Sequence, residues 1–580
     1  MERLEQKKIN GKSYYYYSKW AWVNGKCRRV WQKYLGKLED IANAVGGIGT
    51  LPRYAEIFQW GLPNALWSEC CRAEIIEKID KLCPKRDQGL SIGEYISIAA
   101  INRAIHPESK RSMWSWFSQT TLLRHIPNAS KAALMSQRFW DHMDKISTDM
   151  VPTIWKNILI DVIIREKIDL SSISYDGTNF YTFIDTFNSK CEIGKRGKNK
   201  QGRNNLRQIS YALFCCADGF MPLYYDVYEG NRNDAKQFPI MVRKFHKFLE
   251  ELSGRLSEPP DTTIIFDKGN NSKNNFDLIN SLNKPLKIYF VGSVKLGEHK
   301  ELAEISNNDK IFQTCSDEDL EGAKCFRIKK EFHGKEIVFI VTYNQNLFNT
   351  QFLTLQNDII KATGKLESLK QKLEDRINGI TKGGRTPTVD SIERQSKNYL
   401  KRQYVKNIIK TEVKKGPDGI PRLSYSMDSQ NYSKILDTYI GKNIIITNRE
   451  EWEDEKIIKA YRSQYIIEDI FKQMKDRQIG NWWPQYHWTD SKIIIHGLYC
   501  TISLLLRALI FMRLRNNGLK ISAKRIIAEL DGIKEVVNIY PKRRRQGVEP
   551  KTTVLTKLSE IQEKAISILD LKKCKNDVLG

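Results

Sequence analysis

The sequence has 580 residues, 41% of them hydrophobic and only 17 of them proline, which excludes a disordered or low-complexity protein and predicts several domains. Lys and Arg number 94 against 68 Asp and Glu, so the formal charge is +26. A surplus of this size indicates a polyanionic partner, either nucleic acid or an acidic membrane surface. The charged N-terminal start leads into no apolar run, so we expect no secretory signal.

The cysteines and the most apolar stretch indicate whether the protein is intracellular, secreted or bound in a membrane. The 11 cysteines are scattered without a C-x-x-C pair, which favours reduced thiols and an intracellular protein over a zinc site or a disulfide framework. Residues 493–512 are apolar over about one bilayer width, but His496 and Arg507 interrupt them. We therefore expect a buried core helix there, and no membrane partner.

The first 165 residues divide into two predicted segments. Residues 1–44 contain a β-hairpin over 13–35, turning at Asn24-Gly25, a strong two-residue turn signal. Residues 45–165 form a helical DNA-binding region, in which Ser91 to Glu94 has the spacing of a capping box. A second helix over 112–117 completes either a helix-turn-helix or part of an ordinary helical bundle; the sequence leaves both open.

Residues 166–296 alternate short strands with helices and form the first part of a catalytic core. The predicted elements are strands at 173–183, 209–216 and 222–228, a helix at 238–252, a strand at 262–266, a helix, and a strand at 288–291. This β-β-β-α-β-α-β order is that of the RNase H-like fold. The fold class is therefore a multidomain α/β protein with an RNase H-like mixed sheet.

An insertion domain over 297–440 delays the rest of that core. Leu355, Ile359, Leu366, Leu369 and Leu373 predict one long helix with an apolar stripe. A second helix over 394–415 is expected to carry a ridge of Lys and Arg, which either contacts DNA or is a solvated face. Residues 441–518 then complete the core with a strand at 442–447 and a helix at 454–477. The tail, 519–580, is expected to be helical, with a basic cluster at 542–545.

Two aspartates stand on strands that the RNase H-like order makes neighbours. Asp176 lies inside the first core strand, where aspartate is disfavoured, and Asp267 directly follows the fourth strand. Two adjacent carboxylates repel each other unless a divalent cation lies between them. The pair therefore predicts a metal site at this edge.

A third acid lies on the predicted helix 454–477. Tyr461, Glu468 and Lys475 are spaced by seven, hence on one helical face, which suits metal binding beside a phosphodiester. The alternative is an amphipathic helix with an ordinary salt bridge.

From the hairpin to about residue 515, the chain resembles the DDE-type transposases of bacterial insertion sequences, in the insertion-sequence-four superfamily. The matching pieces are Tyr175 to Thr178, Gly230 to Asp234, Asp267 to Gly269, Tyr461 to Lys475, and Trp483 to His487 with His496-Gly497. The Tyr-Arg-Glu-Lys signature of that family has Gln464 in place of its arginine, and Arg462 stands one residue after the tyrosine.

The resemblance implies a cut-and-paste DNA transposase that cleaves DNA and joins it to a target. Asp176, Asp267 and Glu468 are then the catalytic residues and the ligands of two Mg²⁺ ions, for which Mn²⁺ is expected to substitute. The expected partners are double-stranded DNA, both element ends and target, and a second copy of the chain when two ends are paired. The expected location is the prokaryotic cytoplasm, associated with the nucleoid.

Further residues are expected to hold DNA phosphates. They are Tyr461, Arg462, Lys475, Lys195, Arg196, Lys198, Lys200, Arg203, Arg207 and His487. His487 is read as structural or phosphate-contacting, and His496 as a core histidine rather than a metal ligand. Two rival functions remain open: an RNase H-like nuclease that cuts without joining, and a decayed copy that only binds DNA.

Overall fold

The computed structural model describes residues 1–580 except 24, 46–50, 85–87, 199–201, 217–219, 283–285, 477–479, 484, 541–549 and 572–580. Contacts along the chain form two compact units. The first unit combines residues 1–69, 110–135 and 510–580, and the second combines 70–109 with 136–509. The division into six segments remains a prediction.

The first unit begins with a three-stranded antiparallel sheet in the order β1-β2-β3. Its strands and the helix that follows are β1 (Glu2–Ile9), β2 (Lys12–Val23), β3 (Lys26–Gly36) and α1 (Leu38–Val45). The predicted hairpin is confirmed as β2–β3, and β1 adds a strand to it. Asn24 of the turn lies outside the described residues, while Gly25 has the left-handed φ of 72° that glycine adopts without strain.

A second sheet in this unit joins residues from both ends of the chain, because β17 pairs with β4 on one side and with β18 on the other. The elements are β4 (Tyr54–Gln59), α2 (Gly61–Arg72), α5 (Met113–Phe117), α6 (Leu122–His125), α19 (Ala523–Asp531), β17 (Lys534–Ile539), β18 (Lys551–Leu555) and α20 (Glu560–Ile568). The prediction of an all-helical tail is therefore wrong at β17 and β18. The basic cluster 542–545 lies outside the described residues.

The second unit holds most of the remaining helices that precede and follow the large sheet. They are α3 (Ile75–Leu82), α4 (Ile92–Ile105), α7 (Ser136–Met143), the 3₁₀ turn η1 (Thr148–Met150), α8 (Val151–Glu166) and most of α18 (Asp490–Asn516). The capping box is confirmed: Ser91 Oγ accepts from the Glu94 amide at 3.1 Å, and the Ser91 amide donates to Glu94 Oε2 at 2.6 Å. Every residue of α4 except Glu94 is buried, which favours a bundle helix over an exposed DNA-reading helix.

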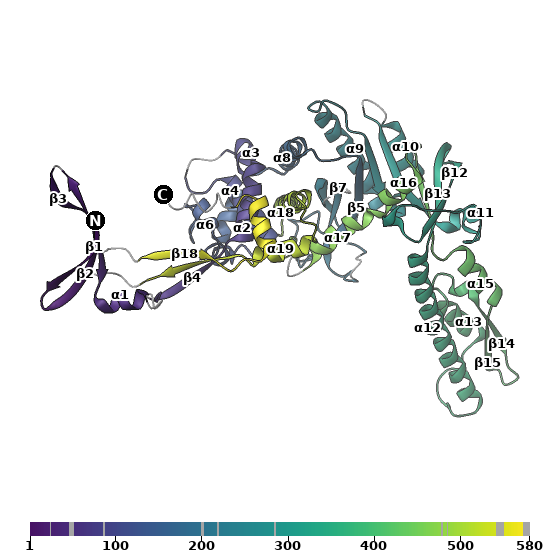
Figure 1. The fold of residues 1–580 in the computed structure, drawn as a ribbon. Coiled ribbons are helices and arrows are strands. Elements are labelled where there is room, and N and C mark those ends of the chain that lie inside the picture. The colour runs from purple at the N-terminus through teal and green to yellow at the C-terminus, as the bar shows by residue number, and fades with distance from the viewer. Residues whose placement is uncertain are drawn as a thin grey trace. The chain divides into compact units, whose positions relative to one another are not determined.

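Within the described residues, ten strands of the second unit form one mixed sheet (Figure 1). Its first part contains β5 (Ser172–Tyr181), β6 (Lys195–Arg196), β7 (Arg207–Cys216), β8 (Pro222–Glu229), α9 (Asp234–Ser253), β9 (Thr262–Phe266), the 3₁₀ turn η2 (Lys268–Asn270), α10 (Lys273–Ser281) and β10 (Ile288–Val294). The strands predicted between 168 and 296 are all present, with the short β6 in addition. They lie in the order β8-β7-β5-β9-β10, antiparallel from β8 to β5 and parallel from β5 to β10.

Helices cover the two faces of this sheet, so alternate residues of each strand are buried on opposite sides. On one face α9 packs against the sheet: Phe238 lies 5.0 Å from Tyr175 and 4.9 Å from Phe266, ring centre to ring centre. On the other face α17 (Gln464–Lys475) packs against β5. Phe180 stacks there on Trp482 at 4.2 Å.

The insertion adds strands to the same sheet before it projects from it. After β10 come the 3₁₀ turn η3 (Leu296–Glu298), α11 (Lys300–Ala303), β11 (Gln313–Thr314), the 3₁₀ turn η4 (Glu318–Leu320), β12 (Ala323–Phe332) and β13 (Lys335–Asn344). Strand β16 (Lys442–Thr447) then lies between β13 and β10, antiparallel to both. The core and the first part of the insertion therefore share one sheet.

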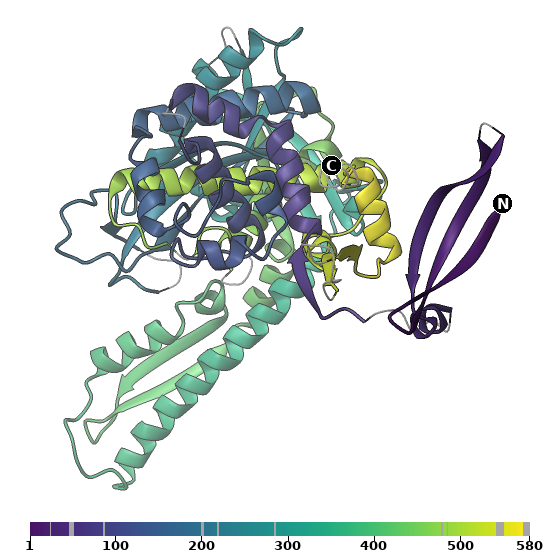
Figure 2. The same cartoon turned by 90° about the vertical axis from the view of Figure 1, so that its left-hand side faces the viewer.

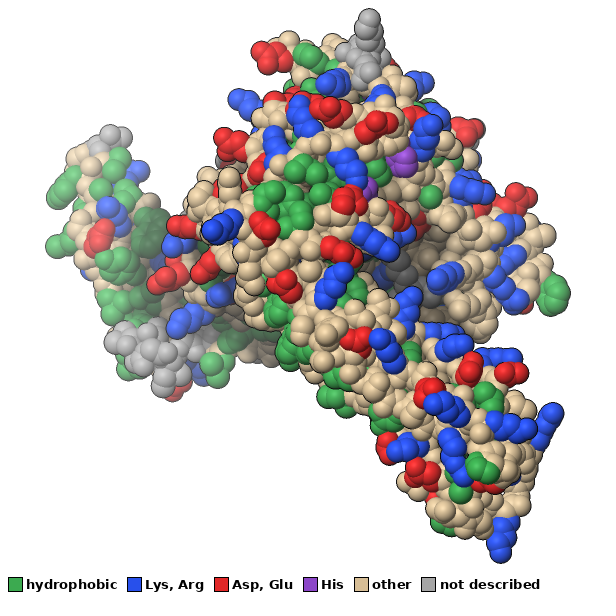
Figure 3. Space-filling view, turned by 90° about the vertical axis from the view of Figure 1, so that its right-hand side faces the viewer, with side chains coloured by type: hydrophobic (Ala, Val, Ile, Leu, Met, Phe, Trp, Pro, Cys, Tyr) green, Lys and Arg blue, Asp and Glu red, His purple; other side chains and the backbone are tan. Residues whose placement is uncertain are grey.

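The insertion then projects away from the sheet (Figures 1 and 2), and its projecting part has a buried core of its own. It contains α12 (Gln345–Ile377), α13 (Val389–Tyr399), α14 (Val405–Ile408), β14 (Ile409–Lys415), β15 (Pro421–Met427) and α15 (Ser429–Thr438). The predicted apolar stripe of α12 is confirmed, since all five of its residues belong to one buried cluster. Lys and Arg side chains are spread over its surface (Figure 3).

Two predicted helices are corrected. The helix expected over 394–415 ends at Tyr399, and residues 409–415 form β14, which pairs with β15. The helix expected over 454–477 is two helices, α16 (Asp454–Arg462) and α17, which meet at Ser463. Arg477 lies outside the described residues.

The expectation of a buried core helix at 493–512 is confirmed. Among the described residues, α18 is the one helix long and apolar enough to cross a membrane, and 89% of its most apolar window is buried inside the protein. A buried core helix of a soluble protein has the same length and composition.

Candidate active site

Asp176 and Asp267 lie at the same level on neighbouring parallel strands. The register of β5 and β9 pairs Tyr175 with Phe266, so each aspartate is the next residue along its strand direction. Adjacent strands are about 4.8 Å apart. Tyr175 and Phe266 both contact α9, so the two aspartates, one residue on, turn toward the opposite face, where α17 packs.

Each of these carboxylates also fixes the local backbone. Asp176 Oδ1 accepts a hydrogen bond from the Gly177 amide at 2.7 Å. Asp267 caps η2, with Oδ1 accepting from the Lys268 amide at 2.7 Å. The Asp267 side chain is exposed and that of Asp176 is half-buried.

Glu468 lies on α17, on the face of the sheet toward which both aspartates turn. The buried side of α17 is formed by Ile466, Ile467, Ile470, Phe471 and Met474, while Glu468 is exposed. At the end of the helix, Lys475 Nζ donates to Thr178 Oγ1 on β5. Thr178 is two residues beyond Asp176 and therefore on the same face of the strand.

Tyr461 is influenced by the carboxylates of both Asp267 and Glu468. Its hydroxyl donates to Ser293 Oγ on β10 at 2.7 Å. Burial raises the pKa of Tyr461; the hydrogen bond with Ser293 opposes this shift, and the carboxylates of Asp267 and Glu468 add to it. Tyr461 therefore lies within electrostatic reach of both carboxylates. It does so from α16, because the helix breaks at Ser463 before Glu468.

The three acids do not form a closed ligand cluster. Within the described ranges, no three His, Cys, Asp or Glu side chains are grouped closely enough to hold a metal ion. The donor set itself, three carboxylates, suits a hard divalent cation such as Mg²⁺. The three-carboxylate metal site stays a prediction.

Asp234, which the sequence places in Gly230 to Asp234, lies close to the same strand from the other side. A Cβ added at Gly177 would stand 3.3 Å from Asp234 Oδ1 and 3.3 Å from the Tyr228 hydroxyl, so only glycine fits here without displacing them. Asp234 is the first residue of α9, where a carboxylate also interacts favourably with the helix dipole. Asp234 therefore lies on the face of the sheet that α9 covers, opposite to the face toward which Asp176 and Asp267 turn.

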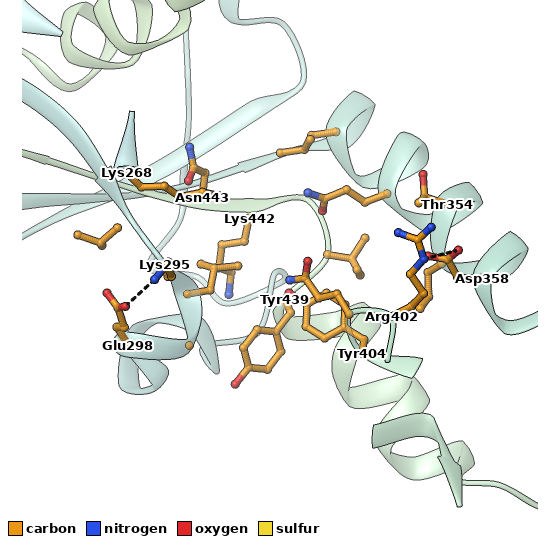
Figure 4. A pocket seen from close by; sticks show the side chains of 18 of the residues that line it. Lys268, Lys295, Glu298, Thr354, Asp358, Arg402, Tyr404, Tyr439, Lys442 and Asn443 are labelled. Atoms are coloured by element: carbon orange, nitrogen blue, oxygen red, sulfur yellow. Dashed lines mark hydrogen bonds and ion pairs between the residues drawn. The ribbon is translucent and has the colours of Figure 1, made fainter. Parts of the chain in front are cut away.

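A cavity of about 960 Å³ extends from Lys268, the residue after Asp267, to the insertion (Figure 4). Its walls include Lys268, Lys295 and Lys442 from the sheet side, together with Tyr461. Lys295 pairs with Glu298 at 3.3 Å, and on the insertion side Arg402 pairs with Asp358 at 3.7 Å. Lysine and arginine side chains therefore line a cavity that begins one residue after Asp267.

The predicted phosphate-binding loop lies near the end of β5. Lys195, Arg196, Lys198 and Arg203 are exposed, and Arg207 is half-buried. Three of their side chains are engaged: Arg196 Nη2 donates to Thr186 Oγ1 at 3.0 Å, Arg207 Nη1 to the Asn188 carbonyl at 3.0 Å, and the Arg203 guanidinium lies 4.6 Å from the Tyr181 ring centre. Lys200 lies outside the described residues.

An aromatic groove of about 970 Å³ follows the same strand, and the sequence does not predict it. Tyr181, Phe187, Trp483, Tyr486 and Trp488 are among its walls, and Phe187 is 94% exposed. The two segments that form it are fastened together, since Asn188 Nδ2 donates to the Trp488 carbonyl at 2.8 Å. The density of aromatic residues in 181–187 and 483–488 is the signal that could have revealed it.

The remaining predicted residues are less exposed to a ligand. His487 is 5% exposed and shares the Tyr499 hydroxyl with His496, at 3.1 Å and 2.5 Å, which favours the structural alternative for His487. His496 is fully buried, with its other ring nitrogen 2.9 Å from the Trp482 carbonyl, so the core reading is confirmed. Arg462 Nη1 donates to the Asp319 carbonyl in η4 at 3.3 Å.

Comparisons with known proteins give little further guidance. No family model matches the chain, and no curated protein matches it. Among solved structures, a chain of the cryo-EM structure of a piggyBac transposase synaptic complex with hairpin DNA aligns over 81% of this chain and 79% of that chain, with 10% sequence identity and a TM-score of 0.32. At that TM-score, the likeness assigns neither a fold nor a function to this chain.

Proposed function

We propose that this protein is a DNA transposase of the DDE type with an RNase H-like core, which cleaves the ends of its element and joins them to target DNA. The observation that carries the proposal is the level pairing of Asp176 and Asp267 on parallel strands, on the face against which the Glu468 helix packs. The strand order β8-β7-β5-β9-β10, with its antiparallel and parallel parts, supports it.

Cleavage breaks a phosphodiester bond by hydrolysis, whereas joining exchanges one phosphodiester bond for another, so neither step needs an energy-supplying cofactor. Hydrolysis adds water across one P–O bond and leaves a 3′-hydroxyl and a 5′-phosphate. That hydroxyl then attacks a target phosphodiester: one P–O bond forms, one breaks, and the departing 3′ oxygen takes up a proton. When bound by Asp176, Asp267 and Glu468, two Mg²⁺ ions, or Mn²⁺ in their place, supply an activated nucleophile and stabilise the leaving oxygen.

The chain's own side chains position the DNA. Lys475, fixed to Thr178 on the face that carries Asp176, supplies a positive charge for the phosphate that reacts. Tyr461, within electrostatic reach of Asp267 and Glu468, is assigned to the same phosphate. Lys195, Arg196, Lys198 and Arg203 hold the backbone further along the duplex.

The proposal also covers the oligomeric state of the DNA-bound protein and its location in the cell. Two element ends have to be held together for joining, so the DNA-bound form is a homodimer. A protein with this chemistry acts where the DNA lies, in the cytoplasm at the nucleoid.

The test uses the purified full chain and a duplex carrying the end of its own element, with Mg²⁺ or with EDTA. Glu468→Gln should lower cleavage by at least about a hundredfold, the scale of losing a catalytic group, and leave end binding unchanged. Asp469→Asn is the matched control: the same helix and the same charge loss, at a side chain that accepts from Gln473 Nε2 at 2.7 Å instead. Equal losses in both variants would contradict the role of Glu468.

Pre-cut ends then separate the rival functions. Joining of such ends to a plasmid by the wild type supports a transposase, whereas cleavage without joining identifies a nuclease. Tight end binding without cleavage in wild type and variant identifies a DNA-binding protein.

A further inference from the structure

The N-terminal sheet β1–β3 has no apolar core of its own. Among the described side chains of residues 1–42, only Ser18 and Gly36 are buried, although eight aromatic residues lie in 1–36. The aromatic rings instead pack across the strands, as between Tyr16 and Tyr34 at 5.2 Å, and beneath cations, as with Arg3 at 4.6 Å from the Trp20 ring centre. A three-stranded sheet usually needs a covered hydrophobic face, so this one is suited to a partner.

One end of the sheet narrows to two strands (Figure 2). Strand β1 pairs with β2 from Lys12 to Lys19, and the Met1 backbone exchanges hydrogen bonds with Trp20 at 2.7 and 2.8 Å. Beyond Trp20, only β2 and β3 continue, with Ala21–Val23 paired to Lys26–Arg28. We call residues 21–23 and 25–28 the ribbon.

The charge of the sheet is strongly positive, and the ribbon contributes to it. Residues 1–36 hold nine Lys and Arg against two Glu, a formal charge of +7. Both glutamates are engaged by side chains outside the ribbon: Glu2 accepts from the Tyr17 hydroxyl at 2.6 Å, and Glu5 from Trp20 Nε1 at 2.7 Å. The ribbon itself contains Lys26 and Arg28 and no acid.

We propose that the ribbon enters the major groove of duplex DNA. The groove is about 12 Å wide and 8.5 Å deep, and it admits a two-stranded β-ribbon. Three residues beyond Trp20 on each strand reach about 10 Å, which matches that depth. Lys26 and Arg28 are exposed, and within the described residues neither has an ion-pair partner, so both are available to phosphates or to guanine edges.

Trp22, at the same end, is 78% exposed and gives the ribbon an apolar surface. Such a surface suits the methyl groups of thymine, which are displayed in the major groove. A second copy of the sheet is a poorer occupant, because it would bring a charge of +7 against another of +7. This inference depends on the proposed function in one respect, the choice of DNA as the partner.

The experiment compares two double variants of the full chain that lose the same charge from the same sheet. Lys26→Ala/Arg28→Ala alters the ribbon, and Lys8→Ala/Lys12→Ala alters the opposite end, near the β1–β2 turn. Binding of a fluorescent duplex is measured over a range of salt concentrations. The ribbon variant should lower the salt slope by about 1.8, or 0.9 for each of two phosphate contacts, and the control variant should lower it much less.

Dimethyl sulfate footprinting identifies the groove, because the reagent methylates guanine N7 on the major-groove side. Wild type and control should protect a guanine that the ribbon variant leaves reactive. If both variants gave equal salt slopes and equal footprints, the assignment of the ribbon to the major groove would be wrong, although the protein would still bind DNA. A wild type that binds no duplex would contradict the proposed function as well, and a ribbon variant altered only in self-association would assign the sheet to a second copy.

Discussion

Lys442 brings a positive charge into the interior at the junction between the sheet and the insertion. Its side chain is 2% exposed, and its ammonium donates to the Ala303 carbonyl at 2.9 Å and to the Ile305 carbonyl. Burial lowers the pKa of Lys442 to about 8 from the ordinary 10.5. The two carbonyls, at the end of α11, accept from the ammonium but do not neutralise it.

This lowered pKa predicts a pH dependence of stability with a definite sign. Below about pH 8, Lys442 is protonated in both the folded and the unfolded chain, and the cost of burying its charge fully opposes folding. Between about pH 8 and 10.5, Lys442 is protonated more often in the unfolded chain than in the folded one. The free energy of unfolding therefore rises with pH in this range. Relative to Lys442→Met, the wild type should gain about 2 kcal/mol in unfolding free energy from about pH 7.5 to about 9.5. Denaturant unfolding at a series of pH values measures this.

Lys434→Met, at a half-exposed lysine of α15 that pairs with Glu304, is the control. Its stability difference from the wild type should stay nearly constant over the same range. If the stability difference from the wild type changed with pH to the same extent for both variants, the effect would come from the protein's general charge and not from Lys442.

At the scale of the element, the insertion is the clearest case of a part with its own interior. Its buried cluster, which includes Leu355, Leu366, Ile408 and Leu423, is distinct from the sheet cluster around Ile265 and Ile445. Leu366 is fully buried, whereas Leu353 on the same helix is 62% exposed.

Leu366→Ala should therefore destabilise the insertion by about 2–5 kcal/mol, because it leaves a cavity, whereas Leu353→Ala should change stability by less than about 0.5 kcal/mol. Hydrogen exchange resolved by peptide measures both. Faster exchange in 345–440, with 262–294 still protected, is the expected pattern for Leu366→Ala. Equal loss of protection in both segments would show that insertion and sheet unfold together.

The sequence predicts those elements whose signals are local. The β2–β3 turn, the Ser91 capping box and the stripe of α12 are set by neighbouring residues, and all three are confirmed. The helix expected over 394–415 is wrong, since the four-residue spacing of Lys406, Lys410 and Lys414 also places these residues on one face of an extended chain. The alternation of Ile409, Thr411 and Val413 favours β14, but its partner β15 is what fixes it.

The candidate site is predicted in the same uneven way. Asp176 and Asp267 follow from strand order alone, and the register places them level. The break at Ser463, which puts Tyr461 on α16 and Glu468 on α17, depends on packing against the sheet and has no local signal. The aromatic groove arises because residues 300 positions apart, Asn188 and Trp488, are hydrogen-bonded.

At the scale of the whole molecule, pairing between distant segments sets the organisation. Strand β17 pairs with β4, Lys534 opposite Gln59, and Arg124 donates to Glu535 at 2.8 Å, although Glu535 is 2% exposed. These contacts close the first unit from pieces at both ends of the chain. No pattern within a window of the sequence could have predicted them.

The charge of the whole molecule is concentrated as well. Residues 1–36 and 345–440 each have a formal charge of +7, more than half of the total of +26 in less than a quarter of the chain. The acids of both segments are already subtracted in these net charges, so the surplus is available to neutralise phosphates.

Binding of the full chain to a duplex of unrelated sequence should therefore depend steeply on salt. With six to ten phosphates neutralised, affinity should fall by about 10³-fold or more between about 50 and 200 mM salt. A single strand of the same length is the matched control, because each phosphate there contributes about 0.7 to the slope instead of 0.9. Fluorescence anisotropy with both probes gives the two slopes. Slopes near zero would mean that the charge of the N-terminal sheet and the insertion does not contact DNA, and the surplus would then need another polyanion as its partner.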